Sequence, residues 1–561
     1  MDKNIEVGRR DFLRGSLAVG AGLVSVGMLA GCSPKEKAAP AAASGSSINW
    51  DKEVEFLVVG AGGSVWGALA AIDKGATSVM IIEKSDLFGG TTALSEGITW
   101  IPMNYVMEQD GLEDNREDAI KYIKTVSQGG STDELIESYV DNAPEFIKWT
   151  RDTYNFGWER YYDWINQDYY QVDGYRGRGR AINIDATGAA KEILGEDWVK
   201  PEKPSNGQAY ELIRYVCEQN NVEILFGTEG KRLYRDESGA VIGLLAAQTD
   251  GTELNIKASK GILLGTGGFD FNDDMRREFL RTPFFASRHV TTNTGDGQRM
   301  GMAIGAGLAN MAAVYGQCCM LPQGEYEGMQ RDAAWTITDS YQFRGKPGAV
   351  VVNRYGKRIG NESTVYANFQ RCMEGWDSPN FKLLNIPAYF ICDSEYTKHY
   401  KLPSATEIGE IPDWLVVADT LEDLATKLEI DPAGLTAEIT EFNANAANGV
   451  DPKFHRGEFS HDQHSVADMT RDDLTNKCLA PLATPPFYGT RYYPASLGTA
   501  GGLKINGKAQ VLDVEGTAIP GLYACGCCAS SPFGAGYVGG GACVGSSSVM
   551  AWLAGRDAME A

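Results

Sequence analysis

The order of apolar and polar residues along the chain predicts strands and helices after residue 50. Residues 54–59 (VEFLVV) form an apolar run with the length and composition of a buried parallel strand. Glycines crowd residues 60–63 (GAGG), which indicates a tight turn into a following helix. A second apolar run, residues 79–82 (VMII), is followed at once by the acidic Glu83. The pattern therefore predicts a strand–turn–helix–strand unit.

This unit has the residue types that bind a dinucleotide. Glycines in the turn allow a helix N-terminus to approach a pyrophosphate, and an acid about 20 residues further on binds ribose hydroxyls. The third glycine of the usual fingerprint is replaced by Val65, and the next glycine is Gly67. Because strand, turn, helix, strand and acid still occur in order, we predict a nucleotide site. Its candidate residues are Gly60, Gly62, Gly63, Glu83 and Lys84.

Three later blocks favour FAD over a nicotinamide cofactor. Residues 89–95 (GGTTALS) resemble the segment that lies along the flavin in fumarate reductase-type flavoproteins. Residues 261–272 are a buried strand running into a glycine turn, residues 292–307 place an aspartate beside a helix start, and residues 521–526 supply a late strand. No second dinucleotide fingerprint is apparent, so we expect no separate NAD(P)H site. The further candidate FAD ligands are Gly90, Thr91, Thr92, Ser95, Gly97, Thr266, Gly267, Asp296 and Gly526.

Two segments of the middle of the chain add a family resemblance. Residues 346–369 (KPGAVVVNRYGKRIGNESTVYANF) and the helical residues 418–456 resemble the capping domain of the family that joins fumarate reductase flavoprotein subunits with 3-ketosteroid Δ1-dehydrogenases. With the FAD blocks, the resemblance covers nearly everything after residue 50. It implies an α/β fold with a Rossmann-like FAD-binding domain formed by both chain ends, residues 51–323 and 496–561. A smaller α+β capping domain, residues 324–495, would interrupt it, with the active site at their junction.

The fumarate reductase branch of this family fits poorly. Its members hold a dicarboxylate with arginines and histidines, but the two arginine positions of the motifs are Tyr366 and Tyr537 here. The histidine near a Met-Gly-Gly is missing from residues 496–502. Arg344 is the only arginine left from that set, and Tyr341 holds the position of the relay glutamate. An unpaired buried carboxylate is costly, which disfavours a dicarboxylate substrate.

The 3-ketosteroid dehydrogenase branch fits better. Residues 537–541 (YVGGG) match its Y-x-G-x-G motif, with glycine where proline is common. The resemblance implies that Tyr537 and the N–H of Gly541 bind a ketone oxygen. It also implies that Tyr366 moves the proton on the neighbouring carbon, and that Tyr169 hydrogen-bonds Tyr366, with Tyr170 as the rival for that place. The implied reaction is a flavin-dependent oxidation of the CH–CH bond next to a ketone, or enone reduction in reverse.

Aromatic residues crowd residues 154–175, and two interpretations stay open. Such density is usual in a core or an interface, but it also suits the wall of a site for a flat apolar ligand. Two other functions also stay open. One is a fumarate reductase-like reductase of an unsaturated carboxylate, and the other is a non-catalytic flavoprotein that shuttles electrons.

Charge and cysteine spacing exclude other classes of function. The 561 residues carry a formal net charge of −23, which disfavours binding to nucleic acid or to an anionic membrane surface. The cysteine clusters at residues 318–319 and 525–528 match no haem, iron–sulfur or zinc spacing. We therefore expect no metal and interpret these cysteines as buried structural thiols.

The first 32 residues have the features of an export signal. Arg9 and Arg10 precede an apolar run, residues 17–30, that is short for a membrane span, and the run leads to a lipobox-like LAGC ending at Cys32. We expect twin-arginine export, lipidation of Cys32 and a flexible tether over residues 33–50. The lipid anchor would be the chain's only membrane contact. With no haem or nicotinamide motif, the enzyme would need an external electron partner such as a membrane cytochrome or quinone.

Overall fold

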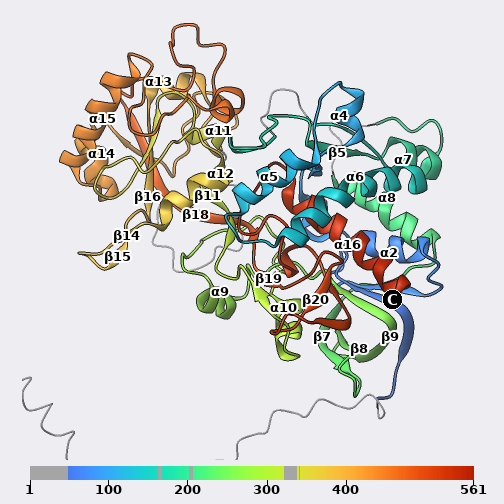
Figure 1. Ribbon diagram of the computed structural model, residues 1–561. Helices are drawn as coiled ribbons and strands as arrows, with labels where there is room; N and C mark the ends of the chain where they lie inside the picture. Colours follow the sequence, from blue (N-terminus) through green and yellow to red (C-terminus); the bar gives the residue numbers. More distant parts are fainter. Residues whose placement is uncertain (1–47, 162–166, 201–205, 321–337, 340) are drawn as a thin grey trace, which may run out of the picture. The chain divides into compact units, whose positions relative to one another are not determined.

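A computed structural model of the chain (Figure 1) describes residues 48–161, 167–200, 206–320, 338–339 and 341–561. The predicted signal, residues 1–32, and the tether up to residue 47 lie outside these described residues. No helix in the described ranges is long and apolar enough to cross a membrane.

Strands from both ends of the described chain form one sheet, whose central strands are parallel. In the described residues this sheet has eight strands, in the order β20-β21-β9-β1-β2-β6, with β8 and β7 added to β9 as an antiparallel extension. The strands are β1 (Lys52–Val59), β2 (Val79–Ile82), β6 (Glu223–Leu225), β7 (Thr228–Arg235), β8 (Val241–Gln248), β9 (Glu253–Leu264), β20 (Gln510–Leu512) and β21 (Ala518–Ala524). Val59 of β1 pairs with Ile82 of β2 and with Leu264 of β9. The predicted parallel α/β sheet built from both chain ends is confirmed.

Helix α2 (Val65–Asp73) packs closely between this sheet and α16 (Ala542–Glu560), its neighbour in Figure 1. Val65, at the position of the missing fingerprint glycine, begins α2 and is fully buried. The close approach occurs at Gly67 instead, where a Cβ would lie 2.6 Å from Leu263 Cδ2 and 2.8 Å from the carbonyl oxygen of Ala551. Gly67 thus provides the helix–strand packing that the fingerprint assigns to its third glycine.

A second sheet, with antiparallel pairing throughout, carries the helices of the predicted cap. Its strands are β11 (Val314–Met320), β12 (Thr338–Asp339), β13 (Ala349–Val352), β16 (Ala388–Asp393), β17 (Val416–Ala418) and β18 (Phe487–Thr499). The helices of this part are α11 (Tyr341–Arg344), α12 (Tyr366–Arg371), α13 (Ser394–His399), α14 (Leu421–Leu428) and α15 (Pro432–Ala446). Separate apolar clusters, which include Val350, Leu424 and Leu435, form its core. The arrangement is α+β. The bounds 324–495 stay predictions, and residue 324 lies outside the described residues.

The remaining elements surround the first sheet or join the two parts. The strands are β3 (Ile98–Trp100), β4 (Gly157–Arg160), β5 (Ala181–Asp185), β10 (Leu308–Ala309), β14 (Trp376–Asp377), β15 (Lys382–Leu383) and β19 (Gly502–Leu503). The helices are α3 (Gly90–Leu94), α4 (Tyr105–Gln109), α5 (Arg116–Ser127), α6 (Asp133–Tyr154), α7 (Thr187–Leu194), α8 (Asn206–Gln219), α9 (Asp273–Phe279) and α10 (Asp296–Ala303).

Candidate active site

A cavity of about 750 Å³ lies at the carboxyl ends of the parallel strands. Val59 of β1, Ile82 of β2 and Gly265, which follows β9, line it. Ligands of doubly wound sheets bind at this edge, and the volume is within the range of about 300–1,000 Å³ that small-molecule sites occupy. Of the site residues predicted from the sequence, all except Gly97 line this cavity.

The positions of the first turn exclude a side chain for two different reasons. Gly60 has φ +104°, and a Cβ on it would lie 2.5 Å from the carbonyl oxygen of Gly265. A Cβ on Gly63 would lie 2.4 Å from Ser547 Oγ. A Cβ on Gly62 meets only Thr92 Oγ1 at 3.3 Å and the carbonyl oxygen of Gly89 at 3.6 Å. The fold therefore requires Gly60 and Gly63, whereas Gly62 leaves open space beside the cavity, which suits a bound pyrophosphate.

Gly62→Val is expected to weaken FAD binding without unfolding the chain. The added side chain competes with the ligand, and such overpacking costs about 1–3 kcal/mol, a factor of roughly 5–150 in Kd. Flavin absorbance per chain after desalting and FAD titration measure the effect. Gly157→Val in β4 is the matched control, since a Cβ there makes ordinary contacts at 3.7 Å and the residue does not line the cavity. Equal FAD content in both variants would contradict this role for Gly62.

Polar side chains behind the turn are held in place. The carboxylate of Glu83 accepts hydrogen bonds from the N–H of Ala61 at 2.8 Å and the N–H of Ser85 at 2.9 Å, and the residue is buried. Lys84 Nζ donates to Thr294 Oγ1 at 2.6 Å and to Asp296 Oδ2 at 3.0 Å. Glu83 thus lies where the acid of a dinucleotide site binds ribose.

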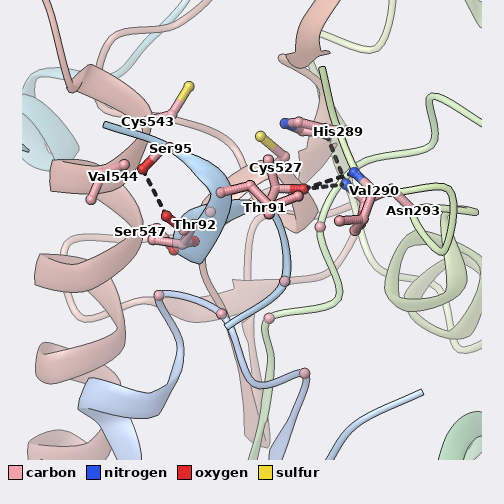
Figure 2. Close-up of a pocket in the computed structure, with 18 of the residues that line it drawn as sticks. Thr91, Thr92, Ser95, His289, Val290, Asn293, Cys527, Cys543, Val544 and Ser547 are labelled. Atoms are coloured by element: carbon pink, nitrogen blue, oxygen red, sulfur yellow. Dashed lines mark hydrogen bonds between the residues drawn. The ribbon is translucent and has the colours of Figure 1, made fainter. Parts of the chain in front are cut away.

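The segment around α3 joins two sides of the cavity. Thr91 Oγ1 accepts a hydrogen bond from the N–H of Val290 at 3.1 Å, and Ser95 Oγ donates to the carbonyl of Thr92 at 2.7 Å (Figure 2). Gly97 lies outside the cavity lining. A Cβ on it would lie 3.0 Å from Asn206 Oδ1, and it lines a smaller neighbouring cavity. Gly97 therefore has a packing role, at a turn where its φ is +78°.

Three tyrosines from distant parts of the chain meet in the cavity. The hydroxyl oxygens of Tyr169 and Tyr366 are 2.8 Å apart. The ring centroid of Tyr537 lies 5.8 Å from that of Tyr169 and 5.9 Å from that of Tyr366. Tyr170, the rival for the place of Tyr169, does not line the cavity. The predicted site tyrosines therefore form one cluster, and their roles stay predictions.

Close pairing of two backbones positions Tyr169 and Tyr537. Asp168 pairs with Gly539 in an isolated bridge, and the N–H of Tyr169 donates to the carbonyl of Val538 at 3.1 Å. A Cβ on Gly539 would lie 2.1 Å from the carbonyl oxygen of Gln167. A Cβ on Gly541, which has φ +83°, would lie 2.2 Å from the carbonyl oxygen of Ile98. The close approach of neighbouring backbone therefore requires glycine at positions 539 and 541. The same backbone pairing holds the Tyr537 side chain in place.

Asp168 anchors the loop that carries Tyr169. It is almost fully buried and accepts hydrogen bonds from Trp100 Nε1 at 2.9 Å, Arg180 Nη1 at 3.0 Å and the N–H of Arg176 at 2.9 Å. Burial raises the pKa of Asp168, and the charge of Arg180 opposes that shift. Three donors on one buried carboxyl fix the loop rigidly.

Burial also decides the protonation of Tyr537. Removal from water raises the pKa of its hydroxyl well above the ordinary value of about 10. The hydroxyl therefore stays protonated near neutral pH and can donate a hydrogen bond. Gly541 lines the same cavity at the N-cap of α16, where backbone N–H groups are available to a ligand.

A buried charge network positions Tyr366 at the start of α12. Glu362, four residues earlier, pairs with Arg358 at 2.6 Å and with Arg456 at 3.3 Å. Arg344 donates to the carbonyl of Thr364 at 2.8 Å and to that of Glu362. Arg344, the arginine left from the dicarboxylate set, does not line the cavity and instead supports the backbone before Tyr366.

Both interpretations of the aromatic segment hold for different residues. Phe156 and Trp158 are buried in the core, and the ring of Phe156 contacts that of Trp66 edge-on, with the ring centroids 5.8 Å apart. Tyr161 and Tyr169 line the cavity. Residues 162–166 of this segment lie outside the described residues.

The cavity also contains residues that no sequence motif indicated. They are Arg288, His289, Gln317, Cys527 and Cys543, whereas Asn293, which also lines the cavity, belongs to the predicted block of residues 292–307. Arg288 supplies an arginine to the cavity wall, whereas the sequence analysis considered only the arginine positions of the family motifs. Arg288 and His289 lie between α9 and α10, in a stretch whose pattern gives no periodic signal.

Comparison with known proteins finds relatives over most of the chain. The family model described as FAD binding domain matches residues 55–544. The chain is 30% identical over 547 residues to the 4-oxocyclohexanecarboxylate 2-dehydrogenase of Sinomonas cyclohexanicum, covering 90% of this chain and 92% of that protein. It is 29% identical to the 3-oxosteroid 1-dehydrogenase of Mycolicibacterium smegmatis, covering 90% and 97%.

A solved structure shares the fold over nearly the whole chain. The 3-ketosteroid Δ1-dehydrogenase of Sterolibacterium denitrificans, in complex with 1,4-androstadiene-3,17-dione, superposes with a TM-score of 0.77 at 26% identity. The match covers 91% of this chain and 100% of that one. The glycine turn, the open space at Gly62 and the buried Glu83 fit FAD. The chain belongs to the FAD binding domain family and is an FAD-dependent oxidoreductase.

Proposed function

We propose that the chain oxidises the CH–CH bond next to the carbonyl of a cyclic ketone, or reduces the corresponding enone in the reverse direction. The observation that carries this proposal is the cluster of Tyr169, Tyr366 and Tyr537 beside Gly541 in the cavity. The names of the relatives support it, because they describe dehydrogenation of oxosteroids and of an oxocyclohexane acid.

Tyr537 and Gly541 would bind the ketone oxygen. The protonated hydroxyl of Tyr537 and the N–H of Gly541 are two donors for an oxygen that gains negative charge as the reaction proceeds. Withdrawing electrons from the carbonyl acidifies the proton on the adjacent carbon. Tyr537 and Gly541 would therefore lower the barrier to removal of this proton without moving themselves.

Tyr366 would move that proton. As phenolate it takes the proton from the α-carbon, and the contact with Tyr169 at 2.8 Å provides a hydrogen bond that stabilises its charged form. Bound FAD supplies the acceptor for the hydride that leaves the β-carbon. In the reverse direction, Tyr366 returns the proton to the α-carbon. Direction depends on the external electron partner.

Arg288 favours a second class of substrate for the same reaction. It lines the cavity, so a carboxylate elsewhere on a cyclic ketone has a cationic neighbour there. One relative is named for such a keto acid. A reductase of a simple unsaturated carboxylate gains less support, since the motif positions for its arginines are Tyr366 and Tyr537. A pure electron shuttle has no use for two donors aimed at an oxyanion.

Anaerobic flavin spectra test this function. The oxidised holoenzyme is mixed with a 3-oxosteroid, with 4-oxocyclohexanecarboxylate and with succinate; the reduced form is mixed with the matching enones and with fumarate. Bleaching by a cyclic ketone, or reoxidation by its enone, is the expected result. Reoxidation by fumarate with no response to any ketone or enone would reject the ketone assignment.

We also propose that the chain is exported by the twin-arginine route and held at the extracytoplasmic membrane face by a lipid on Cys32. Arg9, Arg10, the apolar run and the lipobox-like residues in register support this. A membrane cytochrome or quinone would then exchange electrons with the flavin.

Replacing Arg9 and Arg10 with lysines is expected to leave most of the chain as cytoplasmic precursor. The charge is kept, but the paired guanidinium groups that the route recognises are lost. Cell fractionation and immunoblotting measure the distribution, with Arg14→Lys as the matched control. Unchanged export of the double variant would reject the twin-arginine route.

A further inference from the structure

Arg288 lies on a short segment that pairs with β18, the long strand of the second sheet. The N–H of Arg288 donates to the carbonyl of Ser496 at 2.9 Å, and the N–H of Ser496 donates to the carbonyl of Ala286 at 2.9 Å. Ser287, between these two residues, forms an isolated parallel bridge with Ser496. The backbone before Arg288 is therefore fixed against β18.

Asp270 fixes the chain on both sides of Arg288. This fully buried carboxylate accepts hydrogen bonds from Ser287 Oγ at 2.8 Å and from Ser496 Oγ at 2.9 Å. Its Oδ2 also lies 3.1 Å from His289 Nδ1. Ser287 and His289 are the chain neighbours of Arg288, so both residues that flank it are held by one buried group. Arg288 itself lines the cavity.

Gln317 lines the same cavity from the other side of β18. In the antiparallel pair of β11 and β18, Gln317 lies directly opposite Ala495. Leu497, two residues further along β18, also lines the cavity. Strands are about 4.8 Å apart and rise about 3.4 Å per residue, so the backbones of Gln317 and Arg288 are roughly 10–12 Å apart. The two long side chains can therefore reach one ligand group above β18.

The two side chains lie between the segment predicted to contact the flavin and the tyrosine cluster. On one side, the N–H of Val290 donates to Thr91 Oγ1 at 3.1 Å, as Figure 2 shows. On the other side, the ring centroid of Tyr315 in β11 lies 5.3 Å from that of Tyr537. Gln317 is two residues after Tyr315, a separation of about 7 Å along a strand. This part of the cavity is therefore the part next to the tyrosines.

The chemistry of the two side chains favours a carboxylate. A guanidinium presents N–H donors in a planar fork that matches the two oxygens of a carboxylate, and such charged hydrogen bonds are stronger than neutral ones. The amide of Gln317 can donate a further hydrogen bond to the same group. The apolar skeleton of a steroid would cover Arg288 without offering it an acceptor, which costs free energy.

We propose that Arg288 and Gln317 form a carboxylate subsite, and that the substrate is a cyclic ketone that carries a carboxylate. The ketone oxygen would lie at Tyr537 and Gly541, and the carboxylate would extend towards β18. The class of substrate rests on the ketone chemistry of the proposed function, but the carboxylate contact does not. A compact keto acid, rather than a neutral steroid, is then the preferred substrate.

Binding of unreactive ring compounds tests the subsite without turnover. Cyclohexanecarboxylate and cyclohexanecarboxamide are titrated into oxidised holoenzyme in a calorimeter. The wild type is expected to bind the carboxylate about 10- to 100-fold more tightly than the amide, because only the carboxylate forms a charged hydrogen bond. Arg288→Gln should lose this preference, and Gln317→Leu a smaller part of it. Equal affinities in the wild type would overturn the proposal, even if a variant should fail to fold.

Arg277→Gln is the matched control for charge. It removes the same charge from an exposed position on α9 that does not line the cavity, where Arg277 pairs with Asp274 at 2.6 Å. The control should keep the preference for the carboxylate. FAD content is measured in each variant, since loss of FAD from Arg288→Gln alone would assign this arginine to the cofactor and overturn the subsite.

Flavin reduction distinguishes failure of the subsite from failure of the ketone chemistry. 4-Oxocyclohexanecarboxylate and its amide are mixed with oxidised holoenzyme under nitrogen. The acid is expected to have the higher kcat/KM, and Arg288→Gln should reduce that ratio mainly through KM, because the carboxylate lies away from the reacting carbons. Equal kcat/KM for acid and amide would overturn the subsite and leave the ketone chemistry standing. Tight binding of cyclohexanecarboxylate with no reduction by either ketone would reject the ketone chemistry, and the keto acid as substrate with it.

Discussion

Tyr366→Phe is expected to slow turnover by about 10²–10⁴-fold while FAD stays bound. Loss of the hydroxyl removes the group that would move the α-proton, and leaves the ring and the start of α12 in place. The hydroxyl of Tyr169 loses its partner at 2.8 Å but stays in the cavity, where solvent can satisfy it. Stopped-flow flavin reduction by a cyclic ketone measures the step directly.

Two companion variants make this result specific. Tyr169→Phe should have a smaller effect, greatest at neutral pH, because it removes only the hydrogen bond that stabilises the phenolate. Tyr170→Phe is the control, since Tyr170 does not line the cavity. If Tyr366→Phe reduced flavin at the wild-type rate, Tyr366 would not be the acid/base.

Tyr537→Phe is expected to slow the same step by about 10²–10³-fold. One of the two donors to the ketone oxygen is lost, and Gly541 alone must stabilise the developing charge. The ring contacts of Tyr537 with Tyr169, at 5.8 Å, are kept, so the cavity wall should keep its shape. Because the interaction strengthens as charge develops, kcat should fall more than ketone affinity.

The control for Tyr537 is its neighbour Tyr315. The two rings lie 5.3 Å apart, but Tyr315 does not line the cavity. Tyr315→Phe should therefore retain most activity. A loss in Tyr537→Phe confined to KM would mean that the hydroxyl binds substrate without assisting the reaction.

The nucleotide-binding half of the site was predictable because its signal is local. Strand, glycine turn, helix and acid occur within about 30 residues, and continuous apolar runs fix β1 and β2 in the middle of a sheet. Val65 replaces the third glycine of the fingerprint, but Gly67, two residues later, makes the close contact with Leu263 instead. Pairing of β21 with β9 could be expected only through the family resemblance.

The tyrosine cluster could not be derived from periodicity. Tyr169 and Tyr366 are 197 residues apart, and what joins them is the bridge of Asp168 with Gly539 and the charge network at Glu362. Motif resemblance indicated the residues, and folding of the cap against the first sheet is what brings them into one cavity.

The sequence was least informative about Arg288, His289 and Cys527. The first two lie in an irregular stretch, and Cys527 lies near His289, 238 positions away in the sequence, because both pack against Gly498. Cysteine spacing alone favours structural thiols. Long-range side-chain contacts of this kind leave no pattern in a single sequence.

Product analysis after a single anaerobic turnover tests the central claim most directly. One equivalent of a cyclic ketone deuterated at the α- and β-carbons is mixed with oxidised holoenzyme, and the product is analysed by mass spectrometry and NMR. The predicted product has one new C=C bond conjugated with the carbonyl, has lost one label from each of the two carbons, and forms as the flavin bleaches. A bleached flavin with the double bond elsewhere, or an unchanged ketone beside rapid turnover of fumarate by the reduced enzyme, would contradict the account.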